Sequence, residues 1–202
     1  SVTLADELSK TGYTFAGWKL GTAVYNWSAK TYNASEPIGT GKYGDIILFA
    51  QWTPITYTIA YDGNGSTGGS TASSTHTYDE AKNLTANGFT KTGYSFAGWA
   101  TSASGSVVYS NSQSVTNVRS TTGTTTLYAQ WKPNTYTIKF NSNGSTSGST
   151  ASLSMTYDVA KNLTANGFVK SGYHFTGWNT KADGSGTSYS NKQSVKNLTK
   201  TN

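Results

Sequence analysis

The chain has 202 residues, of which 35% are hydrophobic, 13% aromatic and 12% charged, and its formal net charge is +6. Its Thr, Tyr and Trp favour strands while Gly and Asn favour turns, which argues against a mainly helical fold. Regularly placed aromatic residues also argue against disorder. The chain has no Cys, and therefore neither disulfides nor thiolate chemistry.

The positive charge is spread along the chain. Its lysines are scattered and Arg119 is the only arginine, which indicates a mildly basic surface and no nucleic-acid partner. Weak attraction to anionic surface polysaccharides is the alternative. We expect no membrane insertion, because no run of about 18 apolar residues occurs. A first residue other than Met, without a signal peptide, favours an internal fragment.

A repeat of about 79 residues organises the chain. AKNLTANGF at 81–89 recurs unchanged at 160–168, an offset of 79 positions. KTGYTFAGW at 10–18 matches KTGYSFAGW at 91–99, so a diverged copy opens the chain. These matches predict three domains: repeat 1 (1–52, its C-terminal part), repeat 2 (53–131, complete) and repeat 3 (132–202, lacking its last strand).

The elements of repeat 2 follow from its pattern in chain order. Residues 57–61 alternate as a strand does, and 62–65 favour a hairpin turn because Asn and Gly tolerate positive φ. A second strand is predicted at 73–78. Residues 79–87 are compatible with a loop or with one or two helical turns that Asp79 caps and that end at Gly88.

The second half of repeat 2 predicts three more strands, at 93–99, 107–109 and 125–131. The fold class is therefore mostly β or α+β. A unit of about 79 residues without disulfide or metal depends on large side chains for its core. The aromatic residues that recur in register are the expected core: Tyr94, Phe96, Trp99, Tyr128 and Trp131.

Three motifs in fixed order carry a family resemblance: YTIAYDGNG at 57–65, KTGYSFAGW at 91–99 and TLYAQW at 126–131. The chain resembles the Listeria–Bacteroides repeat family, which includes the B repeats of internalins. The resemblance implies tandem small β-grasp-like domains in an elongated array. It also implies a bacterial protein that is extracellular, at the cell surface or in the cell wall, and not an enzyme.

One departure from the family limits this transfer. Asn-Gly-Phe occupies 87–89 and 166–168, where family members often carry Pro, and the charge balance is basic rather than acidic. A ligand or charge role of another member is therefore not carried over.

Residues for catalysis or metal binding do not recur in the repeats. His76 and His174 align with Met155 and Ser95, so we expect no catalytic residues and no cofactor. Residues 62–65 resemble a calcium loop. Their equivalents in repeat 3 lose the carboxylate, so a hairpin turn without metal is the prediction.

Lys82-Asn83 and Lys161-Asn162, each shortly after an Asp, raise a further alternative. Surface proteins sometimes carry Lys–Asn isopeptide crosslinks, which need a buried Lys, an Asn and a carboxylate together. We expect exposed lysines beside a turn instead.

The sequence favours a stalk or spacer in an adhesin-like protein, with neighbouring repeats as partners. Short joints with Pro54 and Pro133 support it, because such linkers are semi-rigid. The alternative is a binding module for glycans or host and matrix proteins, with Tyr25, Trp27 and Tyr32 as ligand-binding candidates, since their placement is less regular.

A third possibility is assembly into a filament by strand exchange. Repeat 3 stops before the strand that closes repeat 2, and an open sheet edge can accept a strand from another copy. A simple cut of the fragment at that point is the preferred explanation.

Overall fold

The computed structural model describes residues 2–3, 8–20, 31–33, 37–38 and 47–200. Every regular element in these residues is a β-strand, which confirms a mostly β fold. Among them, no helix is long and apolar enough to cross a membrane. The β-grasp-like arrangement remains a prediction.

The helix predicted after Asp79 is wrong. Asp79 adopts a φ of 63°, and the short strand β9 (Lys82–Asn83) follows it. The N–H of Asp79 is bonded to the side chain of Asn117, so this Asp closes a turn instead of capping a helix. Asn and Thr in the next residues favour turns over helix, which has the same effect.

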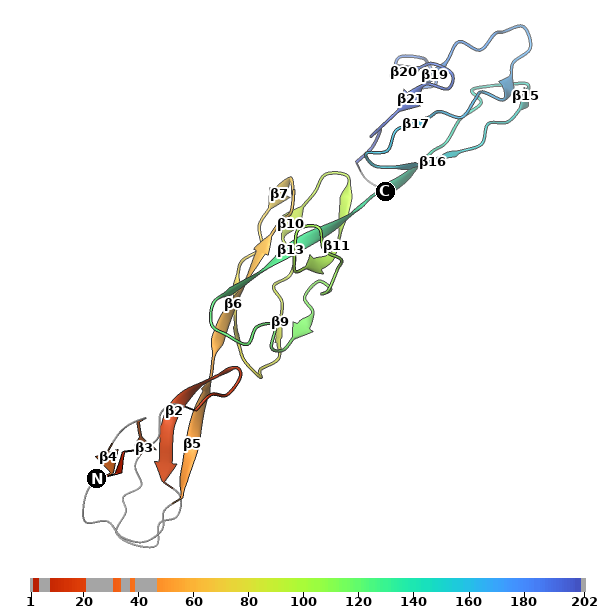
Figure 1. The fold of residues 1–202 in the computed structure, drawn as a ribbon. Coiled ribbons are helices and arrows are strands. Elements are labelled where there is room, and N and C mark those ends of the chain that lie inside the picture. The colour runs from red at the N-terminus through yellow and green to blue at the C-terminus, as the bar shows by residue number, and fades with distance from the viewer. Residues whose placement is uncertain (1, 4–7, 21–30, 34–36, 39–46, 201–202) are drawn as a thin grey trace. The chain divides into compact units, whose positions relative to one another are not determined.

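Repeat 2 is built on a four-stranded sheet with the order β11-β13-β6-β8 (Figure 1). The closing strand β13 runs parallel to β6, and β6 is antiparallel to β8. The last strand of the repeat is thus an inner strand of the sheet. The bounds are β6 Thr56–Asp62, β8 Ser74–Thr77, β11 Tyr94–Ala100 and β13 Thr124–Pro133, which confirms four predicted strands.

Two other predictions for repeat 2 need correction. The turn at 62–65 exists, with Ser66 N donating to Gly63 O at 3.1 Å. It is not a tight hairpin turn, because the antiparallel pairing of β6 with β8 ends at Ile59↔Ser74 and the connection between them contains another short strand. The strand predicted at 107–109 is reduced to one bridge between Trp99 and Tyr109. Two short pairs complete the repeat: β7 (Gly68–Gly69) with β10 (Phe89–Thr90), and β9 with β12 (Ser114–Val115).

The core of repeat 2 depends on its alternating strands. Ile59, Trp99, Leu127 and Ala129 are fully buried. Leu127 and Ala129 lie two positions apart on β13, and therefore on one face of that strand. Of the aromatic residues expected in the core, Trp99 is fully buried and the other four are half-buried: Tyr94, Phe96, Tyr128 and Trp131.

Repeat 3 keeps only part of this sheet. β14 (Thr135–Ile138) pairs antiparallel with β16 (Leu153–Thr156). Its core is formed by Tyr136, Met155, Leu163 and Val195. The remaining pairs are β15 (Ser147–Gly148) with β18 (Phe168–Val169), β17 (Lys161–Asn162) with β21 (Ser194–Val195), and β19 (Trp178–Asn179) with β20 (Ser188–Tyr189).

In repeat 1, β2 (Tyr13–Leu20) pairs antiparallel with β5 (Leu48–Pro54), with a register shift between Phe15 and Gly17. β3 (Thr31–Tyr32) pairs with the other edge of β2. β1 (Val2–Thr3) pairs with β4 (Pro37–Ile38).

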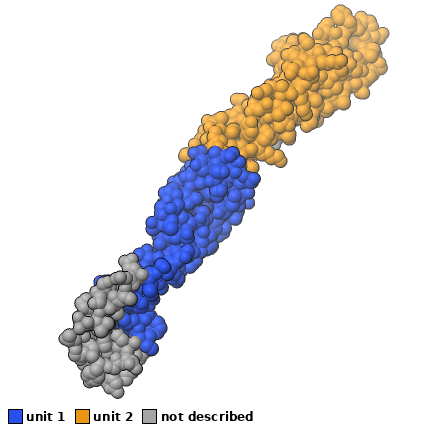
Figure 2. Space-filling view, viewed as in Figure 1, with its two compact units in different colours: residues 1–62, 71–87, 99–128 blue, residues 63–70, 88–98, 129–202 orange. Residues whose placement is uncertain are grey.

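The described residues group into two compact units, coloured in Figure 2. The first contains 1–62, 71–87 and 99–128. The second contains 63–70, 88–98 and 129–202. The joint between repeats 1 and 2 lies within the first unit, and the joint between repeats 2 and 3 lies within the second.

Candidate functional site

A tyrosine–aspartate contact joins repeats 1 and 2. The Tyr13 hydroxyl donates to Asp79 Oδ2 at 2.6 Å. The Tyr13 ring packs edge-on against the ring of Tyr78, with centroids 5.8 Å apart at 71°. Lys10 Nζ lies 3.7 Å from the centroid of the Tyr13 ring, within the range of a cation–π contact.

The same contact joins repeats 2 and 3. The Tyr94 hydroxyl donates to Asp158 Oδ2 at 2.9 Å. The rings of Tyr94 and Tyr157 are again 5.8 Å apart at 71°, and Lys91 Nζ lies 4.9 Å from the centroid of Tyr94. Two successive junctions thus use the same four residue types, with the two tyrosine rings in the same geometry.

Backbone hydrogen bonds fix the linker residue at each joint. Ile55 N donates to Gly12 O at 3.0 Å, and Tyr78 N donates to Ile55 O at 2.9 Å. In the second joint, Asn134 N donates to Gly93 O at 2.9 Å, and Tyr157 N donates to Asn134 O at 2.8 Å. The linker therefore bridges both repeats through its own peptide groups.

A glycine beside each tyrosine makes room for the neighbouring repeat. A Cβ on Gly12 would lie 2.3 Å from the Tyr78 ring, and one on Gly93 would lie 2.3 Å from the Tyr157 ring. Both glycines have a φ near +79°, which residues other than Gly rarely adopt. Any side chain at these positions would require the neighbouring tyrosine ring to move.

An asparagine from the same repeat orients each aspartate. Asn117 accepts from the backbone N–H of Asp79 at 2.6 Å and donates to Asp79 Oδ1 at 2.7 Å. Asn197 does the same for Asp158, at 2.7 and 2.8 Å. One carboxylate oxygen is thus held by the asparagine, and the other is left to accept from the tyrosine of the previous repeat.

The joint has a preferred protonation state. The Tyr13 hydrogen bond, followed by that of Asn117, lowers the pKa of Asp79 below 3.8, and the bond to Asp79 raises the pKa of Tyr13 above 10.0. Bonds from Asn197 and then Tyr94 lower the pKa of Asp158, while Asp158 raises the pKa of Tyr94. Each joint therefore favours an ionised aspartate and a protonated tyrosine.

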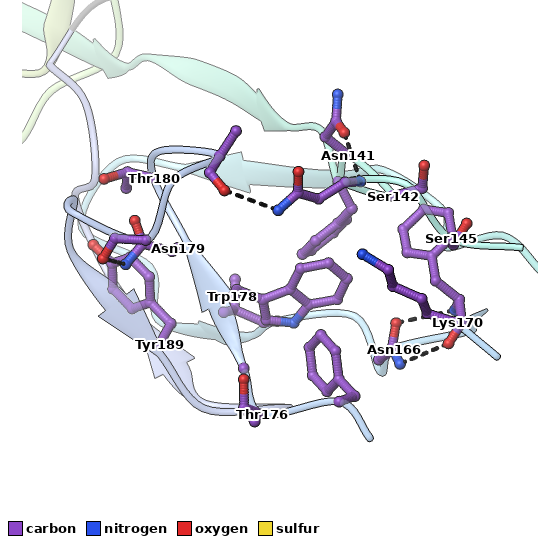
Figure 3. A pocket seen from close by; sticks show the side chains of 18 of the residues that line it. Asn141, Ser142, Ser145, Asn166, Lys170, Thr176, Trp178, Asn179, Thr180 and Tyr189 are labelled. Atoms are coloured by element: carbon purple, nitrogen blue, oxygen red, sulfur yellow. Dashed lines mark hydrogen bonds between the residues drawn. The ribbon is translucent and has the colours of Figure 1, made fainter. Parts of the chain in front are cut away.

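Repeat 3 contains a groove of about 970 Å³ at the position that β13 fills in repeat 2. The Trp178 indole lies in it, with ring centroids 4.5 Å from Phe140 and 4.9 Å from Phe175. Figure 3 shows Trp178 between Asn179 on one side and Lys170 on the other. Aromatic rings and amides therefore line the groove.

Of the three ligand-binding candidates, the structure describes only Tyr32. Tyr25 and Trp27 lie outside the described residues. Tyr32 is buried, and it is the register partner of Trp18 where β3 pairs with β2. A buried ring offers no face for a sugar to stack on.

The structure also shows the contacts of the two crosslink-candidate lysines and of His76. Lys82 is exposed and its Nζ donates to Thr75 O at 2.7 Å, while Lys161 donates likewise to Ser154 O at 2.8 Å. Within the described ranges no group of three or more His, Asp or Glu could hold a metal ion. His76 is buried and stacks on Tyr57, with ring centroids 5.6 Å apart.

Sequence reasoning missed the joint itself. Its signal is present, because Gly-Tyr at 12–13 and 93–94 and Tyr-Asp at 78–79 and 157–158 all recur with the repeat. The recurrence of both pairs at the period of the repeat is the signal for a contact between repeats.

Comparison with known proteins agrees with the repeat structure. The Listeria-Bacteroides repeat domain matches residues 1–51, 57–130 and 136–200. A protein of Evansella cellulosilytica, provisionally named a Gly-rich membrane protein, is 32% identical over 88% of this chain. A second protein of that organism, provisionally named a membrane protein, is 29% identical over 94% of this chain.

The chain spans 20% and 26% of the length of these two relatives. No solved structure matches the chain. Since the family profile matches three segments that together cover nearly the whole sequence, the chain belongs to the Listeria-Bacteroides repeat family.

Proposed function

We propose that these repeats are a non-catalytic spacer in a bacterial surface protein, which holds another part of that protein away from the cell envelope. The observation that carries the proposal is the joint: Tyr13 with Asp79 and Tyr94 with Asp158 make the same contact at successive junctions. A spacer needs a junction that is set in the same way each time, whereas a binding module does not.

The physical basis is that each joint restricts the linker from several sides. The peptide groups of Ile55 and Asn134 are bonded to both neighbours, and a tyrosine ring is seated over a glycine. Pro54 and Pro133 precede these residues and have a fixed φ. Few backbone torsions remain that could change the angle between repeats, so we expect a semi-rigid rod.

The location at the envelope is part of the same proposal. It is supported by membership of the repeat family and by two relatives whose names describe membrane proteins. The repeats themselves would then lie outside the membrane and have neighbouring repeats as their partners.

Small-angle scattering on the 202-residue chain, with and without cell-wall polysaccharides, tests the proposal. We expect an extended monomer whose scattering profile does not change when polysaccharide is added. A compact or self-associating particle, or a profile that changes with polysaccharide, would contradict a spacer role and favour adhesion.

A further inference from the structure

The polypeptide enters repeat 2 through the first strand of its main sheet and leaves through the last. Ile55 alone separates β5 from β6, and Asn134 alone separates β13 from β14. Linkers of one residue leave little slack between the strands that they join. Tension along the polypeptide would therefore act directly on the start of β6 and on the end of β13.

These two strands are paired with each other, and they run parallel. Their register extends from Thr58↔Thr124 to Asp62↔Tyr128, and Thr58 N also donates to Gly123 O at 2.9 Å. In a parallel pair, the start of one strand and the end of the other lie at opposite ends of the ladder. Tension would pull the strands along each other and load all of the bonds at once. In an antiparallel pair both points would lie at one end, and the bonds would break one after another.

Side-chain hydrogen bonds continue the attachment beyond the end of the ladder. Asn64 Nδ2 donates to Ala129 O at 2.8 Å, and Trp131 Nε1 donates to Gly63 O at 2.9 Å. Both bonds join the turn that follows β6 to the last part of β13, and both are partly buried. They lie where the pull on β13 enters, so they would share the load with the ladder.

The position of the two strands in the sheet also opposes their separation. β13 lies between β11 and β6, and β6 lies between β13 and β8, so neither is an edge strand. Ile59 on β6 and both Leu127 and Ala129 on β13 are fully buried. Sliding one strand past the other would carry these side chains out of the core and expose apolar surface to water, which is unfavourable.

We propose that repeat 2 is a load-bearing unit, in which β6 and β13 form a shear clamp that resists tension along the polypeptide. This function goes beyond that of a spacer, because a spacer sets a distance and need not withstand a pull. The clamp is built from the interior of one repeat. It therefore holds whether or not the joints between repeats are rigid.

Single-molecule force spectroscopy on the 202-residue chain tests the clamp by pulling repeat 2 in two directions. The chain has no Cys, so pairs of engineered cysteines provide the handles. Thr56→Cys with Lys132→Cys loads β6 and β13 from opposite ends. Thr56→Cys with Thr122→Cys loads them from the same end, because Thr58 is the register partner of Thr124. All three substituted positions are exposed.

We expect the opposite-end handles to require about two- to fivefold more force than the same-end handles, because five register pairs then resist together instead of singly. Equal rupture forces in the two directions would overturn the proposal.

Asn64→Gly weakens the clamp without changing the strands. It removes the side-chain bond to Ala129 O, and glycine accepts the φ of 46° at this position. The force in the opposite-end pull should fall. The force in the same-end pull should not change, because those handles act at the other end of the ladder. Ser112→Gly is the matched control, since Ser112 also has a positive φ, of 55°, and lies outside both strands. It should leave both forces unchanged.

If a handle variant does not fold, cysteines at Ser1 and Asn202 pull the whole chain, and repeat 2 is recognised by its gain in length. A lower rupture force in Asn64→Gly than in Ser112→Gly then supports the clamp, and equal forces refute it. Scattering measures the extension of the chain, whereas rupture force measures the interior of one repeat. Failure of the spacer role and failure of the clamp are therefore distinguishable.

Discussion

At the scale of single residues, Asp79 and Asp158 combine a turn with a contact between repeats. Their positive φ values place the carboxylate so that one oxygen meets an asparagine and the other meets a tyrosine. Neither aspartate is buried, so their effect is on the joint rather than on the core of a repeat.

The joints should be sensitive to pH at both ends of the range. The pKa of Asp79 is lower in the folded chain. Its contribution to stability is therefore complete above pH 3.8, and is lost as pH falls through the folded-state pKa. The pKa of Tyr13 is higher in the folded chain. Its contribution to stability is therefore complete below pH 10.0, and is lost as pH rises through the folded-state pKa. Melting temperature against pH should show both losses.

The control for that titration is a chain with Tyr13→Phe and Tyr94→Phe. It should lose the part of the alkaline decrease that comes from these two hydroxyls, and it should be less stable than the unmodified chain near pH 7. Identical pH profiles for the two chains would contradict the assigned protonation states.

His76 should add a separate acid sensitivity to repeat 2. Burial, followed by the charge of Lys82, lowers the pKa of His76 below 6.5, so its stabilising effect is complete above 6.5 and is lost as pH falls toward the folded value. Repeat 3 has Met155 at this position, also fully buried. His76→Met should therefore flatten the decrease in stability that sets in as pH falls below 6.5.

Thermal unfolding at a series of pH values, followed by circular dichroism, measures the His76 effect. An equally steep acid decrease in the His76→Met variant would show that other groups cause it.

At the scale of elements, the closing strand β13 completes the four-stranded sheet of repeat 2 and part of its core. β13 supplies Leu127 and Ala129 to the core and anchors the turn at Asn64. Among the described residues of repeat 3, the corresponding sheet consists of β14 and β16.

Leu127→Ala should destabilise repeat 2 by about 2–5 kcal/mol, because it leaves a cavity in a fully buried site. Val108→Ala is the matched control, since Val108 is 53% exposed and should change stability by less than about 0.5 kcal/mol. Urea unfolding measures both. Similar losses for the two variants would mean that β13 does not form the core.

Two turn glycines allow a matched comparison, because a Cβ on Gly93 would meet the Tyr157 ring and one on Gly172 would meet no described residue within 4 Å. Gly172→Ala should cost only the strain of a positive φ, about 1–2 kcal/mol. Gly93→Ala adds a clash with the Tyr157 ring, which should cost about 1–3 kcal/mol more. Equal losses in urea unfolding would indicate that Tyr157 does not rest on Gly93 in solution.

The strands could be predicted from sequence because alternation and turn residues are local signals. That holds for Thr56–Asp62 and Thr124–Pro133. The joint could not, because Tyr13 and Asp79 are 66 residues apart and their pairing depends on how two repeats meet. The helix predicted after Asp79 failed for a similar reason, since Asn117, distant in sequence, takes the N–H of that residue.

At the scale of the whole molecule, the recurring contacts predict that successive repeats are held by a fixed joint. The Gly-Tyr and Tyr-Asp pairs recur because each junction is formed by the same contact. The chain also has few charged residues. Variants that weaken the joint should change the angle between repeats without unfolding them.

The distance between two spin labels, measured by pulsed electron paramagnetic resonance, tests that prediction most directly. The chain has no Cys, so Ser106→Cys and Thr187→Cys, both at exposed positions, place one label on repeat 2 and one on repeat 3. We predict a narrow distance distribution that broadens when Tyr94→Phe and Asp158→Ala are added, and that stays narrow with Tyr173→Phe. A distribution already as broad in the chain with an intact joint would contradict the account.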